Sequence, residues 1–204
     1  PKCNMAGLGL EDAPADYDYK LISNDNPPKT FTVKVKYAMI SEVVKIAVEQ
    51  DKSSRDSTLD TNSEILEYIV QYMNQCKGKD VVEIKSPLKG KVAEVQGEDL
   101  KPVWTKICGS GNEWYADFIW EIAKNRQKLM MLTKAADQYA IKGLLKLCIA
   151  MYATFLKFCP YEDLDRVLDP NITDGRLLPM REDIKNVEQR RNPDPSGGED
   201  AKEQ

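Results

Sequence analysis

Alternating apolar and polar residues predict a β-hairpin near the start of the patterned part of the chain. Residues 19–23 and 31–35 form two such runs, and the Asn-, Asp- and Pro-rich residues 24–28 lie between them as a turn. The alternation places the apolar side chains of the hairpin on one buried face. A further short strand is expected at residues 57–60.

Apolar residues at helical spacing predict two helices after the hairpin. The expected buried positions are Ile40, Val43, Val44 and Ala47 in the first helix and Ile65, Ile69, Tyr72 and Met73 in the second. Residues 61–64, Thr-Asn-Ser-Glu, fit a capping box, in which two side chains satisfy free backbone donors at a helix start. We therefore expect the second helix to begin at this segment.

The segment 77–111 has no clear period, and we interpret it as an insertion into the core. It is rich in Lys and Gly and contains one candidate short strand at residues 81–84. Acidic residues alternate with its lysines, so a solvated loop of mixed charge is favoured over a basic patch.

The chain becomes strongly helical after Trp114. Apolar stripes are expected at Leu129, Leu132, Ala136 and Tyr139, and then at Leu144, Leu145, Cys148, Ile149, Tyr152, Phe155 and Leu156. Another helix is expected from Pro160, a residue that the first turn of a helix tolerates, and a last helix at residues 181–191. Strands followed by helices indicate an α+β fold.

These patterns divide the chain into four parts. We expect a flexible arm at residues 1–16 and a core at residues 17–158 that carries the insertion. A C-terminal helical extension follows at residues 159–191. Residues 192–204 are rich in Pro, Gly and acidic residues and are expected to form a disordered tail.

Composition narrows the classes of partner and compartment. The chain has 204 residues, of which 42% are hydrophobic, so it can bury a core. Its 29 basic and 33 acidic residues give a net charge of −4, which disfavours nucleic acid as a partner. The five cysteines are scattered, and no apolar run is long enough to span a membrane. We expect free thiols, no membrane association, and a cytoplasmic or nuclear protein.

The chain contains no histidine, which removes the commonest general base and His-ligated zinc. Residues 109–111, Gly-Ser-Gly, lack the following Lys of a phosphate loop. Residues 169–175 are faintly similar to a calcium loop, but the glycine is one position late and Met180 occupies the position of the bidentate glutamate, so a turn between helices is expected. Cys108 is interpreted as a bystander thiol in a loop. We therefore expect no enzyme activity, no cofactor, no metal site and no small-molecule substrate.

The apolar C-terminal helices allow two interpretations. Residues such as Tyr152, Phe155 and Leu156 are typical of an ordinary core. Several short apolar helices near the chain end can also leave a face uncovered, which would form a groove for a partner helix. Sequence patterning leaves both interpretations open.

A resemblance to a known family is carried by residues 135–145, Ala-Ala-Asp-Gln-Tyr-Ala-Ile-Lys-Gly-Leu-Leu. This block resembles the signature AANYLDIKGLL of the S-phase kinase-associated (Skp) adaptor family of SCF ubiquitin ligases. Elongin C is a more distant relative. Residues 114–118 are similar to the family's WDxEF segment, and residues 160–172 to its TPEEIRKxFNI segment. The hairpin and the helix up to Cys76 match as well, so the likeness covers about residues 19–192.

This resemblance implies a BTB/POZ-like α+β core followed by C-terminal helices that bind an F-box, with a cullin-binding face on the core. Carried over by position, the F-box surface comprises Leu144, Tyr152, Phe155, Leu156, Pro160, Leu164, Val167, Leu168 and Ile172. The cullin face comprises Ile40, Asp137 and Gln138. The implied function is a non-catalytic adaptor that links F-box proteins to a cullin scaffold for protein ubiquitination.

The sequence departs from the family pattern at two places, and these departures suggest a second hypothesis for the function. Asp137 and Gln138 stand where the family has Asn and Tyr, so an amide replaces an aromatic residue of the cullin contact. The family's closing Trp-Cys-acid end has no counterpart in residues 192–204. The alternative is a divergent Skp-like structural subunit of a cytoskeletal or ciliary assembly. Such a subunit would keep the F-box-type interface without cullin binding.

Overall fold

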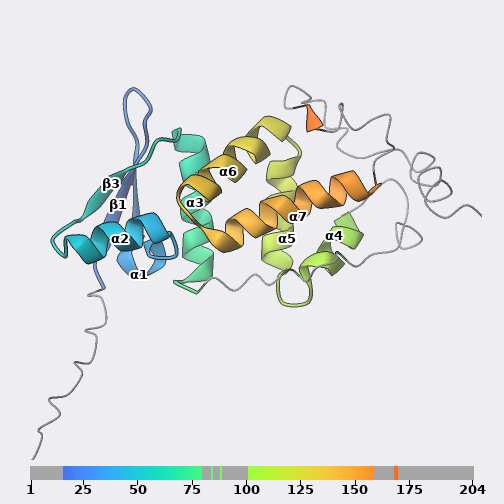
Figure 1. The fold of residues 1–204 in the computed structure, drawn as a ribbon, viewed down its shortest axis with the longest axis horizontal. Coiled ribbons are helices and arrows are strands. Elements are labelled where there is room, and N and C mark those ends of the chain that lie inside the picture. The colour runs from blue at the N-terminus through green and yellow to red at the C-terminus, as the bar shows by residue number, and fades with distance from the viewer. Residues whose placement is uncertain (1–15, 80–83, 85–87, 89–100, 159–167, 170–204) are drawn as a thin grey trace, which may run out of the picture. The chain divides into compact units, whose positions relative to one another are not determined.

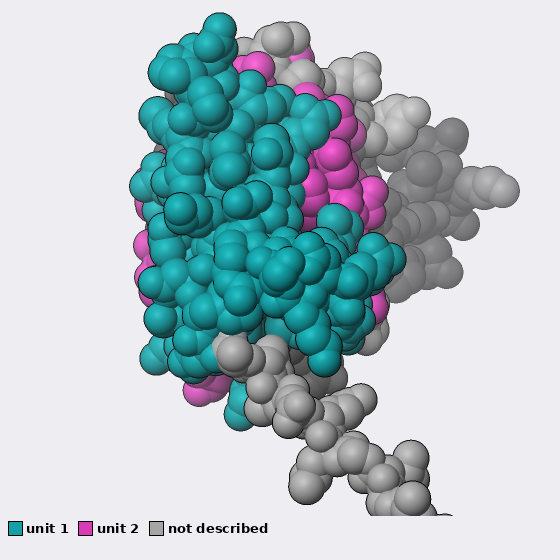
Figure 2. Space-filling model, turned by 90° about the vertical axis from the view of Figure 1, so that its left-hand side faces the viewer, with its two compact units in different colours: residues 1–80 teal, residues 81–204 magenta. Residues whose placement is uncertain are grey.

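A computed structural model describes residues 16–79, 84, 88, 101–158, 168 and 169 (Figure 1). Within these residues the chain forms three strands and seven helices. It divides into two compact units, residues 1–80 (unit 1) and residues 81–204 (unit 2), which Figure 2 colours separately. The three strands lie in unit 1, and the helices dominate the rest, which is compatible with the predicted α+β class.

The predicted hairpin is present in unit 1. Strands β1 (Asp18–Ile22) and β2 (Thr30–Lys34) pair antiparallel, and β3 (Asp56–Thr58) pairs parallel to β1, in the order β2-β1-β3. The third strand agrees with the expected short strand to within two residues. Alternate side chains of the hairpin, Tyr19, Leu21 and Val33, are buried, as the period of two requires.

Tyr19 anchors β3 to β1 from inside the core. Its side chain is fully buried, and its hydroxyl donates to the Asp56 carbonyl oxygen at 3.0 Å. The same hydroxyl lies 2.6 Å from Ser57 Oγ. Because β3 has only three residues, these hydrogen bonds are a useful addition to its backbone pairing with β1.

Helices α1 (Val35–Ala38) and α2 (Glu42–Gln50) follow the hairpin. Ser41 caps α2, since its Oγ accepts a hydrogen bond from the Val44 N–H. Val44 and Val48 are the buried residues of α2, whereas Val43 is 43% exposed. The expected burial of Val43 is therefore wrong.

Helix α3 (Ser63–Cys76) has the predicted buried stripe, because Ile65, Ile69, Tyr72 and Met73 are all fully buried. Its start differs from the expected capping box. Asn62 is the N-cap and accepts a hydrogen bond from the Ile65 N–H at 2.9 Å, and Thr61 precedes it as a buried residue. An Asn side chain serves as an N-cap at least as well as Thr, so the cap moves by one position.

Unit 2 contains helices α4 (Lys101–Cys108), α5 (Glu113–Ala123), α6 (Arg126–Gln138) and α7 (Lys142–Phe158). The presence of α4 shows that residues 101–108 are helical, although the segment 77–111 was expected to be irregular. Trp104 of α4 is fully buried, and its indole N–H donates to the Ala116 carbonyl oxygen of α5 at 2.9 Å. This helix belongs to the core of unit 2.

The Gly-Ser-Gly segment is the turn between α4 and α5, in agreement with its assignment as a loop. Gly109 and Gly111 have φ values of 84° and 86°, which glycine adopts with little strain. The Asn112 side-chain amide donates to the Cys108 carbonyl oxygen at 2.8 Å and satisfies the end of α4.

Helices α6 and α7 pack side by side (Figure 1). The predicted stripe of α6 is confirmed, since Leu129, Leu132, Ala136 and Tyr139 are buried. The short connection has Ala140 in the left-handed region at φ 50°. The Ile141 N–H donates to the Ala136 carbonyl oxygen and the Ala140 N–H to that of Asp137. This is the hydrogen-bond pattern of a Schellman motif.

Several expectations lie outside the described residues. They comprise the arm, the strand at residues 81–84, nearly all of the helix expected from Pro160, the helix at residues 181–191 and the tail. Among the described helices, none is both long and apolar enough to cross a membrane.

We predict that Tyr19→Phe lowers the free energy of unfolding by about 1–2 kcal/mol, because the Asp56 carbonyl oxygen and the Ser57 hydroxyl lose their hydrogen-bond partner in the core. Urea unfolding of the full chain measures the change. Tyr37→Phe is the control: Tyr37 is only half-buried and the substitution should change stability by less than about 0.5 kcal/mol. Equal effects of the two substitutions would contradict the anchoring role of Tyr19.

Candidate protein-binding groove

Helix α7 is apolar on two sides, and only one of them is covered. The covered side consists of Leu144, Leu147, Cys148, Met151 and Phe155, all fully or almost fully buried. The second side consists of Leu145, Ile149, Tyr152 and Leu156, which we call the open row. Ile149 is 52% exposed and Leu156 37% exposed.

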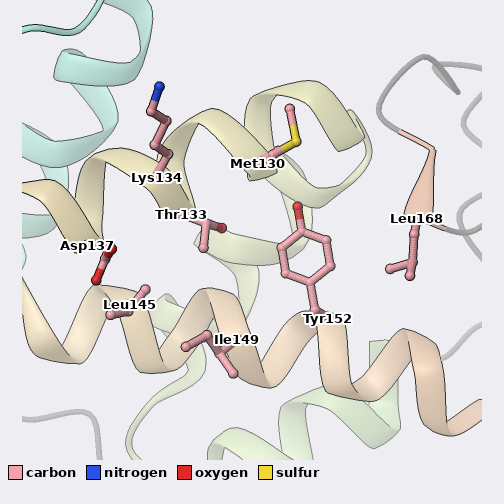
Figure 3. Close-up of a pocket in the computed structure, with 8 residues that line it drawn as sticks. All are labelled: Met130, Thr133, Lys134, Asp137, Leu145, Ile149, Tyr152 and Leu168. Atoms are coloured by element: carbon pink, nitrogen blue, oxygen red, sulfur yellow. The ribbon is translucent and has the colours of Figure 1, made fainter.

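The open row borders a groove of about 590 Å³ between α6 and α7. Figure 3 shows its eight lining residues. They are Met130, Thr133, Lys134 and Asp137 of α6, Leu145, Ile149 and Tyr152 of α7, and Leu168. The Tyr152 ring stands between the two helices with its hydroxyl toward α6, and Leu168 closes the end opposite Asp137 (Figure 3).

The groove has one apolar wall and one mixed wall. The α7 wall presents two aliphatic side chains and an aromatic ring, while α6 adds a hydroxyl and two charges. Burial raises the pKa of the Tyr152 phenol, so this group stays neutral at physiological pH. An open groove of this composition is suited to a helix that buries an apolar face and keeps a polar edge in water.

The expected F-box residues separate into three sets. Tyr152 and Leu168 line the groove, and the half-exposed Leu156 continues the open row. Leu144 and Phe155 are 0% and 1% exposed and pack inside unit 2. Their expected role in a partner surface stays a prediction. The remaining members, Pro160, Leu164, Val167 and Ile172, lie outside the described residues.

Sequence reasoning missed part of the groove as a site. Leu145 and Ile149 were expected only as members of an apolar stripe, and Met130 and Thr133 were not expected at all. One feature of the sequence could have indicated the groove. The apolar residues of α7 cover more of the helix circumference than a single packing face needs.

The expected cullin residues occupy two units. Asp137 and Gln138 are exposed in the last turn of α6, and Asp137 also lines the groove. Ile40 is half-buried in unit 1, just before α2. The structure thus places the two positions at which the chain departs from the family motif on the surface, and their expected role in cullin binding stays a prediction.

Cys108 was expected in a loop. It lies instead at the end of α4, where it is almost fully buried. Burial raises the pKa of its thiol to about 12, and that of the Cys148 thiol to about 12 as well. Both thiols are therefore protonated and weak nucleophiles at neutral pH. Within the described residues, no three side chains among His, Cys, Asp and Glu gather in a way that could hold a metal ion.

Comparison with known proteins assigns no family: no protein-family model matches the chain, and no curated protein matches it either. The resemblance to the Skp family accordingly rests on the motif residues quoted above. Those at positions 135–145 form the end of α6, its Schellman motif and the start of α7.

We predict that Phe155→Ala lowers the free energy of unfolding by about 3–5 kcal/mol, because it leaves a cavity beside α6. Ile149→Ala should cost less than about 1 kcal/mol, since half of that side chain is already in water. Urea unfolding measures both variants. A large loss from Ile149→Ala would mean that the open row is covered in solution.

We predict that Cys108 and Cys148 resist iodoacetamide in the folded protein at pH 8 and remain protected at pH 10, because their thiols stay protonated below about pH 12. Unfolding in urea should increase the labelling rate at least about a hundredfold, since labelling then needs no opening of the fold. Peptide mass spectrometry locates the label. Rapid labelling of either residue in the folded chain would contradict this assignment.

Proposed function

We propose that this protein is a non-catalytic Skp-like adaptor that binds an F-box-type helical protein through the groove between α6 and α7. In this proposal it links that protein to a cullin scaffold for protein ubiquitination. The open row on α7 carries the proposal: Ile149 and its neighbours remain exposed to water although α7 is otherwise packed on both α5 and α6.

Physical considerations support a helical partner. Leu145, Ile149 and Tyr152 are spaced by four and three residues, so they form one continuous stripe along α7. A partner helix that covers the stripe gains about 25 cal/mol for each Å² of apolar surface removed from water. The aromatic ring of Tyr152 in the middle of the groove is of the type that often dominates interface energies.

The family motif supports the same site. Residues 135–145 build the connection that holds α6 beside α7, and the groove lies directly after it. The proposal includes a BTB/POZ-like core, and the small three-stranded sheet with seven helices among the described residues is compatible with the α+β class of such a core. The site of action in the proposal is the cytoplasm or nucleus, where SCF ligases work.

The alternative function is a structural subunit of a cytoskeletal or ciliary assembly that keeps the F-box-type partner and does not bind a cullin. It is favoured by one observation: Asp137 and Gln138 are both exposed and polar at the position of the family's cullin contact. An exposed amide offers less burial energy to a partner than an aromatic ring.

We predict that the full chain binds purified F-box domains and that Ile149→Asp weakens this binding at least about tenfold, because it places a charge against an apolar helix. Leu168→Asp should act in the same direction. Isothermal titration calorimetry with a panel of F-box domains measures the affinities. Ile46→Asp is the matched control, since Ile46 is 51% exposed on α2 of unit 1 and lies outside the groove.

A cullin N-terminal domain, added to the complex with an F-box domain, separates the two functions. Stoichiometric co-elution in gel filtration supports the adaptor and excludes the alternative. An F-box complex that binds no cullin supports the structural subunit. Absence of binding to every F-box domain, or unchanged binding by Ile149→Asp, overturns both.

A further inference from the structure

We draw no further inference here: the strongest candidate, the apolar groove between α6 and α7 that Ile149, Tyr152 and Leu168 line, belongs to the site already described, and nothing among the residues that the structure describes shows what covers it.

Discussion

The packing of one side of α7 is the interaction on which the rest of unit 2 depends. Leu144, Cys148 and Phe155 on that side are fully buried, and the helix contacts both α5 and α6. The buried Arg126 at the start of α6 places its guanidinium 4.0 Å from the centre of the Phe155 ring and donates to the Ala123 carbonyl oxygen at 3.2 Å. A cation over an aromatic face tolerates burial better than one in an apolar pocket. These contacts orient α7, and its second apolar side then remains exposed.

The groove combines two kinds of surface on two helices. The α7 wall supplies the apolar area from which a bound helix would gain affinity in the proposed function. The α6 wall supplies Met130, Thr133 and two exposed charged residues, Lys134 and Asp137. The Schellman motif around Ala140 keeps the two walls adjacent. Asp137, one of the positions at which the chain departs from the quoted family motif, also lines the groove.

Local sequence patterns predicted much of the fold. They failed where two neighbouring residues can both cap a helix, where a helix is short, and where tertiary packing decides burial. The hairpin and the stripes of α3 and α6 follow from periods of two and 3.6 residues. The N-cap of α3 was placed one residue early because Thr61 and Asn62 can both cap a helix. Helix α4 was missed because its eight residues are too few for a clear period, and only contact with α5 makes Trp104 a core residue. Tertiary packing also decided that Val43 is exposed.

The sequence by itself determined that the chain lacks histidine chemistry, that a hairpin precedes its helices, and that α7 carries more apolar residues than one packing face requires. It also contains the motif that forms the connection from α6 to α7. Only the tertiary structure decided which of these apolar residues are core and which are surface. Phe155 and Ile149 belong to the same stripe in the sequence, yet one is buried and the other is half in water. The reason is geometric: periodicity defines a helix face, but the position of the neighbouring helices determines which part of that face is covered.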